Sequence, residues 1–173
     1  MTAVPDQQTV TPDGKSVQKL IDGVVVRRGV THVDERGALY ELYDPRWGVH
    51  PADLVYAYIT TTRPGWAKGW GLHHHHDDRY VIWQGRVELA LYDARAGSPT
   101  EGLESRLLLS EHDRCLVNIP AGVWHAERNI GDTEVVIVNF PTEPFHHVAP
   151  DKERLPLDND VLPVDLGPGW HGW

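Results

Sequence analysis

The stretch that decides the fold is Tyr80-Val-Ile-Trp-Gln-Gly-Arg-Val-Glu-Leu-Ala-Leu-Tyr92, near the middle of the chain. It begins with an apolar run over residues 80–83, and Gly85 follows as a turn signal. Residues 86–92 then alternate, with Val87, Leu89 and Leu91 on one face and Glu88 and Ala90 on the other. The stretch therefore predicts two strands joined by a tight turn, the second with one face in the core.

Short apolar runs of the same kind lie on both sides of this stretch, at residues 24–26, 54–59, 107–109, 115–119 and 135–138. Gly, Pro or Asp separates them, which is typical of an all-β sandwich or barrel and not of alternating β-α units. We expect one jelly-roll domain over residues 23–173. Residues 1–22 are expected to form a polar N-terminal arm, with one or two helical turns over residues 15–22.

Composition narrows the class of protein. The chain has 173 residues and a formal net charge of -9, which argues against broad nucleic-acid binding because that needs a basic surface. A single cysteine, Cys115, allows no disulfide within the chain and fits a reducing compartment. The N-terminal residues contain no apolar run that could act as a signal peptide or membrane span. We therefore expect a cytoplasmic protein that binds neither nucleic acid nor membrane.

Four consecutive histidines, His73 to His76, precede the deciding stretch. If these residues are extended, His73 and His75 share one face and His74 and His76 the other. Two imidazoles on one strand face can supply two of the ligands of a metal ion. The same run could instead be a solvated loop.

A second histidine lies in Ile119-Pro-Ala-Gly-Val-Trp-His125-Ala-Glu-Arg-Asn129. Pro120, Gly122, His125 and Asn129 fit the second motif of the cupins, P-x-G-x-x-H-x-x-x-N. Counting back from Gly85 puts Asp78 in the acidic position of the first cupin motif, but closer to His75 than that motif requires. The cupin metal motif is thus half matched.

The chain resembles the dTDP-4-dehydrorhamnose 3,5-epimerases in five segments that occur in that family's order. They are Asp34–Glu41, Gly71-Leu72-His73, Ser98–Gly102, Ile119–His125 and Pro150–Asp160. The resemblance implies a cupin-type jelly roll, a homodimer, and action on a nucleotide-linked 4-keto-6-deoxy sugar without a metal or other cofactor.

The resemblance also implies roles for individual residues. His73 holds the place of the base that removes a proton beside the keto group, a role that suits an imidazole. Asp160 matches the carboxylate that orients this base, and His125 matches a second histidine of the active site. Arg36 and Glu41 match residues that hold the nucleotide end.

Three departures from the family pattern affect the expected chemistry. Trp70 stands where the family has an arginine, so Lys68 or Arg63 would have to contact phosphate. Asp78 stands at the position of a lysine near the sugar. The family's proton-donating tyrosine is missing, because no tyrosine follows Tyr92. We therefore expect altered specificity.

Three functions stay open. The first is a sugar-nucleotide epimerase or ketoisomerase that uses His73 and, as a ketoisomerase, His75. The second is a metal-dependent cupin with His73, His75 and His125 around one divalent transition-metal ion, and with Asp78 or His76 as the fourth ligand. The third is a sugar-binding cupin without catalytic activity. We favour the first, with Trp70, Asp78 and Lys68 lining the substrate site.

Overall fold

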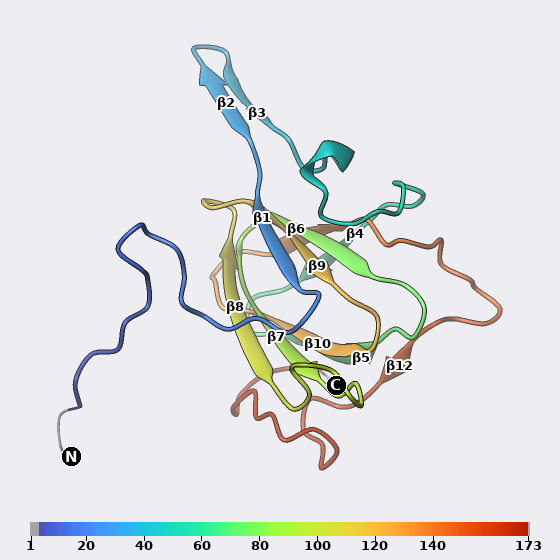
Figure 1. The fold of residues 1–173 in the computed structure, drawn as a ribbon. Coiled ribbons are helices and arrows are strands. Elements are labelled where there is room, and N and C mark those ends of the chain that lie inside the picture. The colour runs from blue at the N-terminus through green and yellow to red at the C-terminus, as the bar shows by residue number, and fades with distance from the viewer. Residues whose placement is uncertain (1–3, 173) are drawn as a thin grey trace.

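Two five-stranded antiparallel sheets face each other in the computed structural model, which describes residues 4–172 (Figure 1). The strand order of the first sheet is β1 (Val25–Arg28), β9 (Cys115–Ile119), β6 (Asp78–Gln84), β11 (Val135–Asn139) and β4 (Tyr58–Thr62). The strand order of the second is β12 (Glu153–Arg154), β5 (Ala67–Leu72), β10 (Val123–Asn129), β7 (Arg86–Asp93) and β8 (Glu104–Ser110). The predicted all-β fold is confirmed.

The main core lies between the two sheets and follows the alternation read from the sequence. Val87, Leu89 and Leu91 of β7 are buried in this core with residues of β6, β9, β10 and β11. Ala90 lies on the opposite face of β7. Gly85 makes the turn between β6 and β7 with a φ of 85°, and a Cβ there would lie 3.0 Å from the Glu134 carbonyl oxygen. Only glycine fits this turn without strain.

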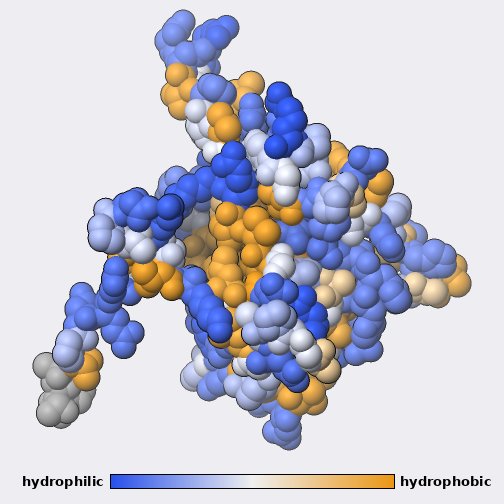
Figure 2. All heavy atoms as spheres, viewed as in Figure 1, coloured by the Kyte–Doolittle hydropathy of each residue, from blue (hydrophilic) through white to orange (hydrophobic). Residues whose placement is uncertain are grey.

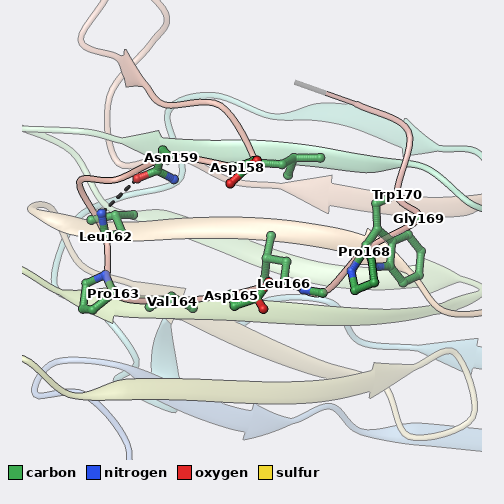
Figure 3. A pocket seen from close by; sticks show the side chains of 12 residues that line it. Asp158, Asn159, Leu162, Pro163, Val164, Asp165, Leu166, Pro168, Gly169 and Trp170 are labelled. Atoms are coloured by element: carbon green, nitrogen blue, oxygen red, sulfur yellow. Dashed lines mark hydrogen bonds between the residues drawn. The ribbon is translucent and has the colours of Figure 1, made fainter.

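The chain after β12 covers the outer face of the second sheet. Leu162, Val164 and Leu166 are buried there against Trp70 and Trp124. The outer side of the same segment carries a cavity lined by residues 157–159 and 162–170 (Figure 3). Its lining contains carboxylates but no histidine, lysine or arginine, so it offers no group suited to proton transfer near neutral pH.

The N-terminal arm differs from the expectation at its end. Residues 15–22 form no helix, because tertiary contacts hold them extended. Ile21 is 1% exposed and packs in the main core, and the Asp22 amide donates to Thr100 Oγ1 at 2.8 Å. The burial of Ile21 outweighs the weak helical preference of this short segment.

A β-hairpin of β2 (Thr31–Asp34) and β3 (Gly37–Tyr40) extends from the body of the molecule (Figure 1). The 3₁₀-helix η1 (Pro45–Trp47) follows it. Hydrophobic residues gather on the face between this hairpin and the arm, over β1 (Figure 2). Within residues 4–172, no helix has the length and hydrophobicity needed to cross a membrane.

Candidate active site

The four histidines lie in a bend between β5 and β6, not on a strand. The rings of His73 and His76 approach each other with centroids 4.0 Å apart, whereas His74 and His75 are exposed. The expected pairing of His73 with His75 on one face is therefore wrong. Alternation holds only along an extended strand, and β5 ends at Leu72.

Asp151 fixes this bend from the far end of the chain. Its carboxylate accepts hydrogen bonds from the backbone amides of His74 at 2.8 Å and His75 at 2.9 Å. It also lies 2.9 Å from His76 Nδ1, and the Asp151 backbone carbonyl accepts a hydrogen bond from His73 Nδ1. Burial would raise the pKa of Asp151, but the two amides and the neighbouring histidines lower it to about 2.

His73, Asp78 and His125 meet in the interior beside this bend. Oδ2 of Asp78, at the start of β6, lies 3.3 Å from His73 Nε2 and 3.5 Å from His125 Nε2 on β10. Asn139 donates to the other carboxylate oxygen of Asp78 at 2.6 Å. Burial would raise the pKa of Asp78, but His73, His125 and Asn139 hold it below its ordinary value. Burial lowers the pKa of His125 to about 4, so this imidazole is neutral at pH 7.

Two cavities of 350 and 340 Å³ lie against these histidines. The first is lined by His73 and His76 and the second by His125, and Tyr58, Lys152 and Arg154 line both. The phenol oxygen of Tyr58 accepts a hydrogen bond from Asn139 at 2.9 Å. Burial raises the pKa of Tyr58 to about 12 and lowers the pKa of Lys152. The cavities thus combine imidazoles, a protonated phenol and an amine in one place.

The structure brings together four of the residues singled out from the sequence, namely His73, Asp78, His125 and Lys68. Lys68 lines the second cavity, where its Nζ lies 3.9 Å from Oε1 of the buried Glu127. His75 points away from this group into solvent. Three of the predicted metal ligands, His73, His125 and Asp78, therefore lie together, and His75 does not join them.

Asp160 does not accompany His73. It is exposed in the segment after β12, and in the described part of the chain the carboxylate beside the His73 ring is that of Asp78. The late segment does reach this place, but through Asp151 and not through Asp160, and the carboxylate that faces His73 Nε2 comes from β6.

Trp70 is fully buried on the outer face of the second sheet, away from the cavities. Alternation along β5 explains this position, because Gly69 and Gly71 take the inward positions and Trp70 the outward one. Its expected place in the substrate site is wrong. Arg36 is exposed on the hairpin and pairs with Asp34, and neither Arg36 nor Glu41 lines the two cavities.

Sequence reasoning missed Tyr58, Asp151 and Lys152, and it considered His76 only as a possible metal ligand. Tyr58 lies in a predicted strand, and its direction depends on pairing with β11, where it faces Asn139. Asp151 and Lys152 lie within the late segment that was matched as a motif, so that match was the available signal.

Residues 32–153 match the family model described as the polysaccharide biosynthesis C-terminal domain. The chain is 34% identical over 155 residues to a probable low-salt glycan biosynthesis epimerase, Agl13, of Haloferax volcanii, covering 88% of this chain and 98% of that protein. Two solved structures share the fold with TM-scores of 0.77 each. One is a dTDP sugar isomerase from Desulfovibrio desulfuricans, at 23% identity over 84% of this chain and 91% of that one. The other is a dTDP-6-deoxy-D-glucose-3,5-epimerase from Legionella pneumophila with dTDP-4-keto-L-rhamnose. It is 20% identical, over 91% of this chain and 86% of that one. These structures confirm the predicted epimerase-like cupin jelly roll.

The role of Asp151 in holding the bend is testable through stability. We expect Asp151→Asn to lower the free energy of unfolding at pH 7 by about 1–2 kcal/mol, because charge-assisted hydrogen bonds are lost. The pKa of about 2 in the folded protein lies below the value of about 3.9 expected when unfolded. The stabilisation is therefore complete above pH 4 and disappears as the pH falls towards 2. Urea unfolding across this range would show it, with the exposed Asp158→Asn as control. A constant difference between variant and parent down to pH 2 would contradict the assignment.

Proposed function

This chain belongs to the family described as the polysaccharide biosynthesis C-terminal domain, and from that premise we propose that it is an isomerase acting on a nucleotide-linked keto sugar. The enzyme would remove a proton from the carbon beside the keto group and return it. The observation that carries this proposal is the buried His73–Asp78–His125 group at the wall of two cavities.

The charges of the second cavity, which lies against His125, support a nucleotide sugar as the substrate. Its walls contain Lys68, Lys152 and Arg154, although the whole chain is acidic. Cations gathered at one site suit a diphosphate. The solved relatives that act on dTDP-linked sugars favour a dTDP-4-keto-6-deoxyhexose or a similar sugar.

His73 is the base that we propose on the basis of the sequence. Because a carbonyl only accepts, His73 Nδ1 carries the proton donated to Asp151, and the lone pair of the neutral ring is on Nε2. The C–H electron pair would move into an enolate while Nε2 takes the proton. Asp78, 3.3 Å away, would stabilise the imidazolium in the role first assigned to Asp160.

Tyr58 is the group that we propose returns a proton to the other face. Its phenol lies in both cavities and is protonated at neutral pH, since its pKa is raised to about 12. It comes from β4, beside the β11 strand on which the family's tyrosine is missing. A neighbouring strand would thus supply the same chemical group.

We also propose that the chain forms a homodimer, through β1. This strand lies at the edge of its sheet, and its Val25 and Val26 are 38% and 39% exposed. An exposed apolar edge strand favours pairing with another copy. A cytoplasmic location fits the single cysteine. The expected contact of Arg36 and Glu41 with the nucleotide stays a prediction.

Deuterium incorporation tests the proposed function. In D₂O with dTDP-4-keto-6-deoxyglucose, we expect deuterium beside the keto group, and we expect His73→Ala to slow its incorporation by at least about 100-fold. His75→Ala is the matched control from the same histidine run, and it should retain the rate because His75 points into solvent. No incorporation by the unaltered protein would favour the sugar-binding cupin without catalytic activity.

Substitution of Tyr58 separates removal of the proton from its return. We expect Tyr58→Phe to keep deuterium incorporation but to lower formation of the inverted sugar by about 100-fold, because only the donor on the second face is lost. Tyr92→Phe, outside both cavities, is the control. NMR of the product distinguishes the two events, and unchanged inversion in Tyr58→Phe would remove Tyr58 from the mechanism.

The dimer is tested by light scattering. We expect twice the 19.5 kDa mass of one chain, and a monomer in Val26→Lys because a charge is placed on the paired edge. Val161 is also exposed but lies in the segment after β12, so Val161→Lys should leave the mass unchanged. A dimer that persists in Val26→Lys would exclude this edge.

A further inference from the structure

We propose that His73, Asp78 and His125 hold one divalent transition-metal ion. Their Nε2, Oδ2 and Nε2 atoms are buried and make no hydrogen bond. The side chains are 8%, 1% and 7% exposed, and the three atoms lie within 4.8 Å of one another. Buried polar atoms without partners are rare in proteins, so three of them facing one point require an occupant.

The hydrogen bonds on the other side of each ring decide which atoms carry lone pairs. His73 donates from Nδ1 to the Asp151 carbonyl, and His125 Nδ1 lies 3.2 Å from the Val123 carbonyl. Each neutral imidazole therefore directs the Nε2 lone pair at the Asp78 carboxylate. Histidine ligands of metals are held in this way, by a carbonyl or carboxylate on the second nitrogen.

A proton satisfies this arrangement less completely than a metal ion. A proton on His73 Nε2 bridges to Asp78 but leaves the lone pair of His125 without a partner. One cation at the centre accepts all three lone pairs at once.

The two distances to Asp78 Oδ2 agree with coordination. Atoms about 2.1 Å from a common ion lie roughly 3.0 Å apart at right angles and roughly 3.4 Å apart at tetrahedral angles. The two contacts of Asp78 Oδ2 are 3.3 and 3.5 Å. Two imidazoles and one carboxylate suit Fe²⁺, Mn²⁺, Ni²⁺ or Zn²⁺ and not Ca²⁺, which prefers oxygen ligands.

The surroundings also favour an ion at this point. Asn139 bonds to Oδ1 of Asp78, which leaves Oδ2 directed at the two rings. The buried Glu127 adds a second carboxylate nearby and partly offsets Lys152, the cation nearest His125. The alternative group of His73, His76 and Asp151 is different, because its polar atoms already have partners: His76 Nδ1 lies 2.9 Å from the Asp151 carboxylate, and His73 Nδ1 donates to the Asp151 backbone carbonyl.

An ion at this site would deepen the proposed function without depending on it. Three protein ligands leave coordination positions for water or for the keto oxygen of a sugar, whose polarisation makes the adjacent proton more acidic. Because Nε2 would then be coordinated, His73 could not be the base. Lys152, which lines both cavities, is the group that would take the proton. Only this catalytic role, and not the site itself, rests on the proposed function.

The test is the metal content of the full chain without a tag, purified without nickel and then titrated with Zn²⁺, Mn²⁺ and Co²⁺. We expect about one ion per chain, and at least about tenfold weaker binding in Asp78→Asn and His125→Gln. Circular dichroism would check that these variants fold. The visible spectrum of the Co²⁺ form should change with Asp78→Asn.

The matched control is the double variant His74→Ala/His75→Ala, which removes the exposed half of the histidine run. It should bind as the unaltered protein does. Binding lost in this control but kept in Asp78→Asn, or no stoichiometric binding of any of the three ions, would overturn the site. Unchanged deuterium incorporation by folded, metal-free protein would overturn the catalytic role of the ion and leave the proposed function standing. A bound ion without any deuterium incorporation would overturn the proposed function and the catalytic role of the ion, and would leave the metal site standing.

Discussion

The Asp78 carboxylate, buried between two imidazoles, is the group on which the rest of the structure depends. A buried charge without partners costs several kcal/mol, so the fold must bring partners to it. Groups from both sheets surround it: Asn139 on β11 donates to Oδ1, while His125 on β10 and His73, directly after β5, face Oδ2. A shift of either sheet would leave this charge unpaired. The stability of the sandwich and the geometry of the site are thus set by the same contacts.

Strand alternation then determines what the site can contain. The inward positions of β10 carry Val123, His125 and Glu127, and those of β5 carry two glycines. A Cβ on Gly71 would lie 3.1 Å from Lys152 Cε and 3.3 Å from His125 Nε2, so a larger residue there would require these two side chains to shift. The small residues of β5 make room, and the polar residues of β10 fill it.

The departures from the epimerase pattern have a common result. An aspartate where that family has a lysine replaces a cation with an anion at the centre of the site, and this anion is what directs two imidazole lone pairs to one point. Tyr58, the proton donor that we propose, lies on β4, which pairs with β11. In this proposal the fold and the kind of reaction are kept, while the charge of the centre is reversed. Such a negatively charged centre suits the metal ion that we propose. A centre with a lysine, as in the epimerase pattern, already carries a positive charge and would not need one.

The sequence by itself determined the all-β fold and the buried face of β7, and it singled out His73, His125 and Asp78. The fold rests on alternation along strands, Asp78 was found by its spacing from a turn glycine, and the two histidines were found by their resemblance to known motifs. Tertiary structure decided that His76 and not His75 faces His73, because a bend obeys no such period. It also replaced Asp160 by Asp78, placed Asp151 under the bend, and turned Trp70 outward and Tyr58 inward. Most of these contacts join residues far apart in the chain. A local sequence pattern cannot show which distant segments come together in the fold.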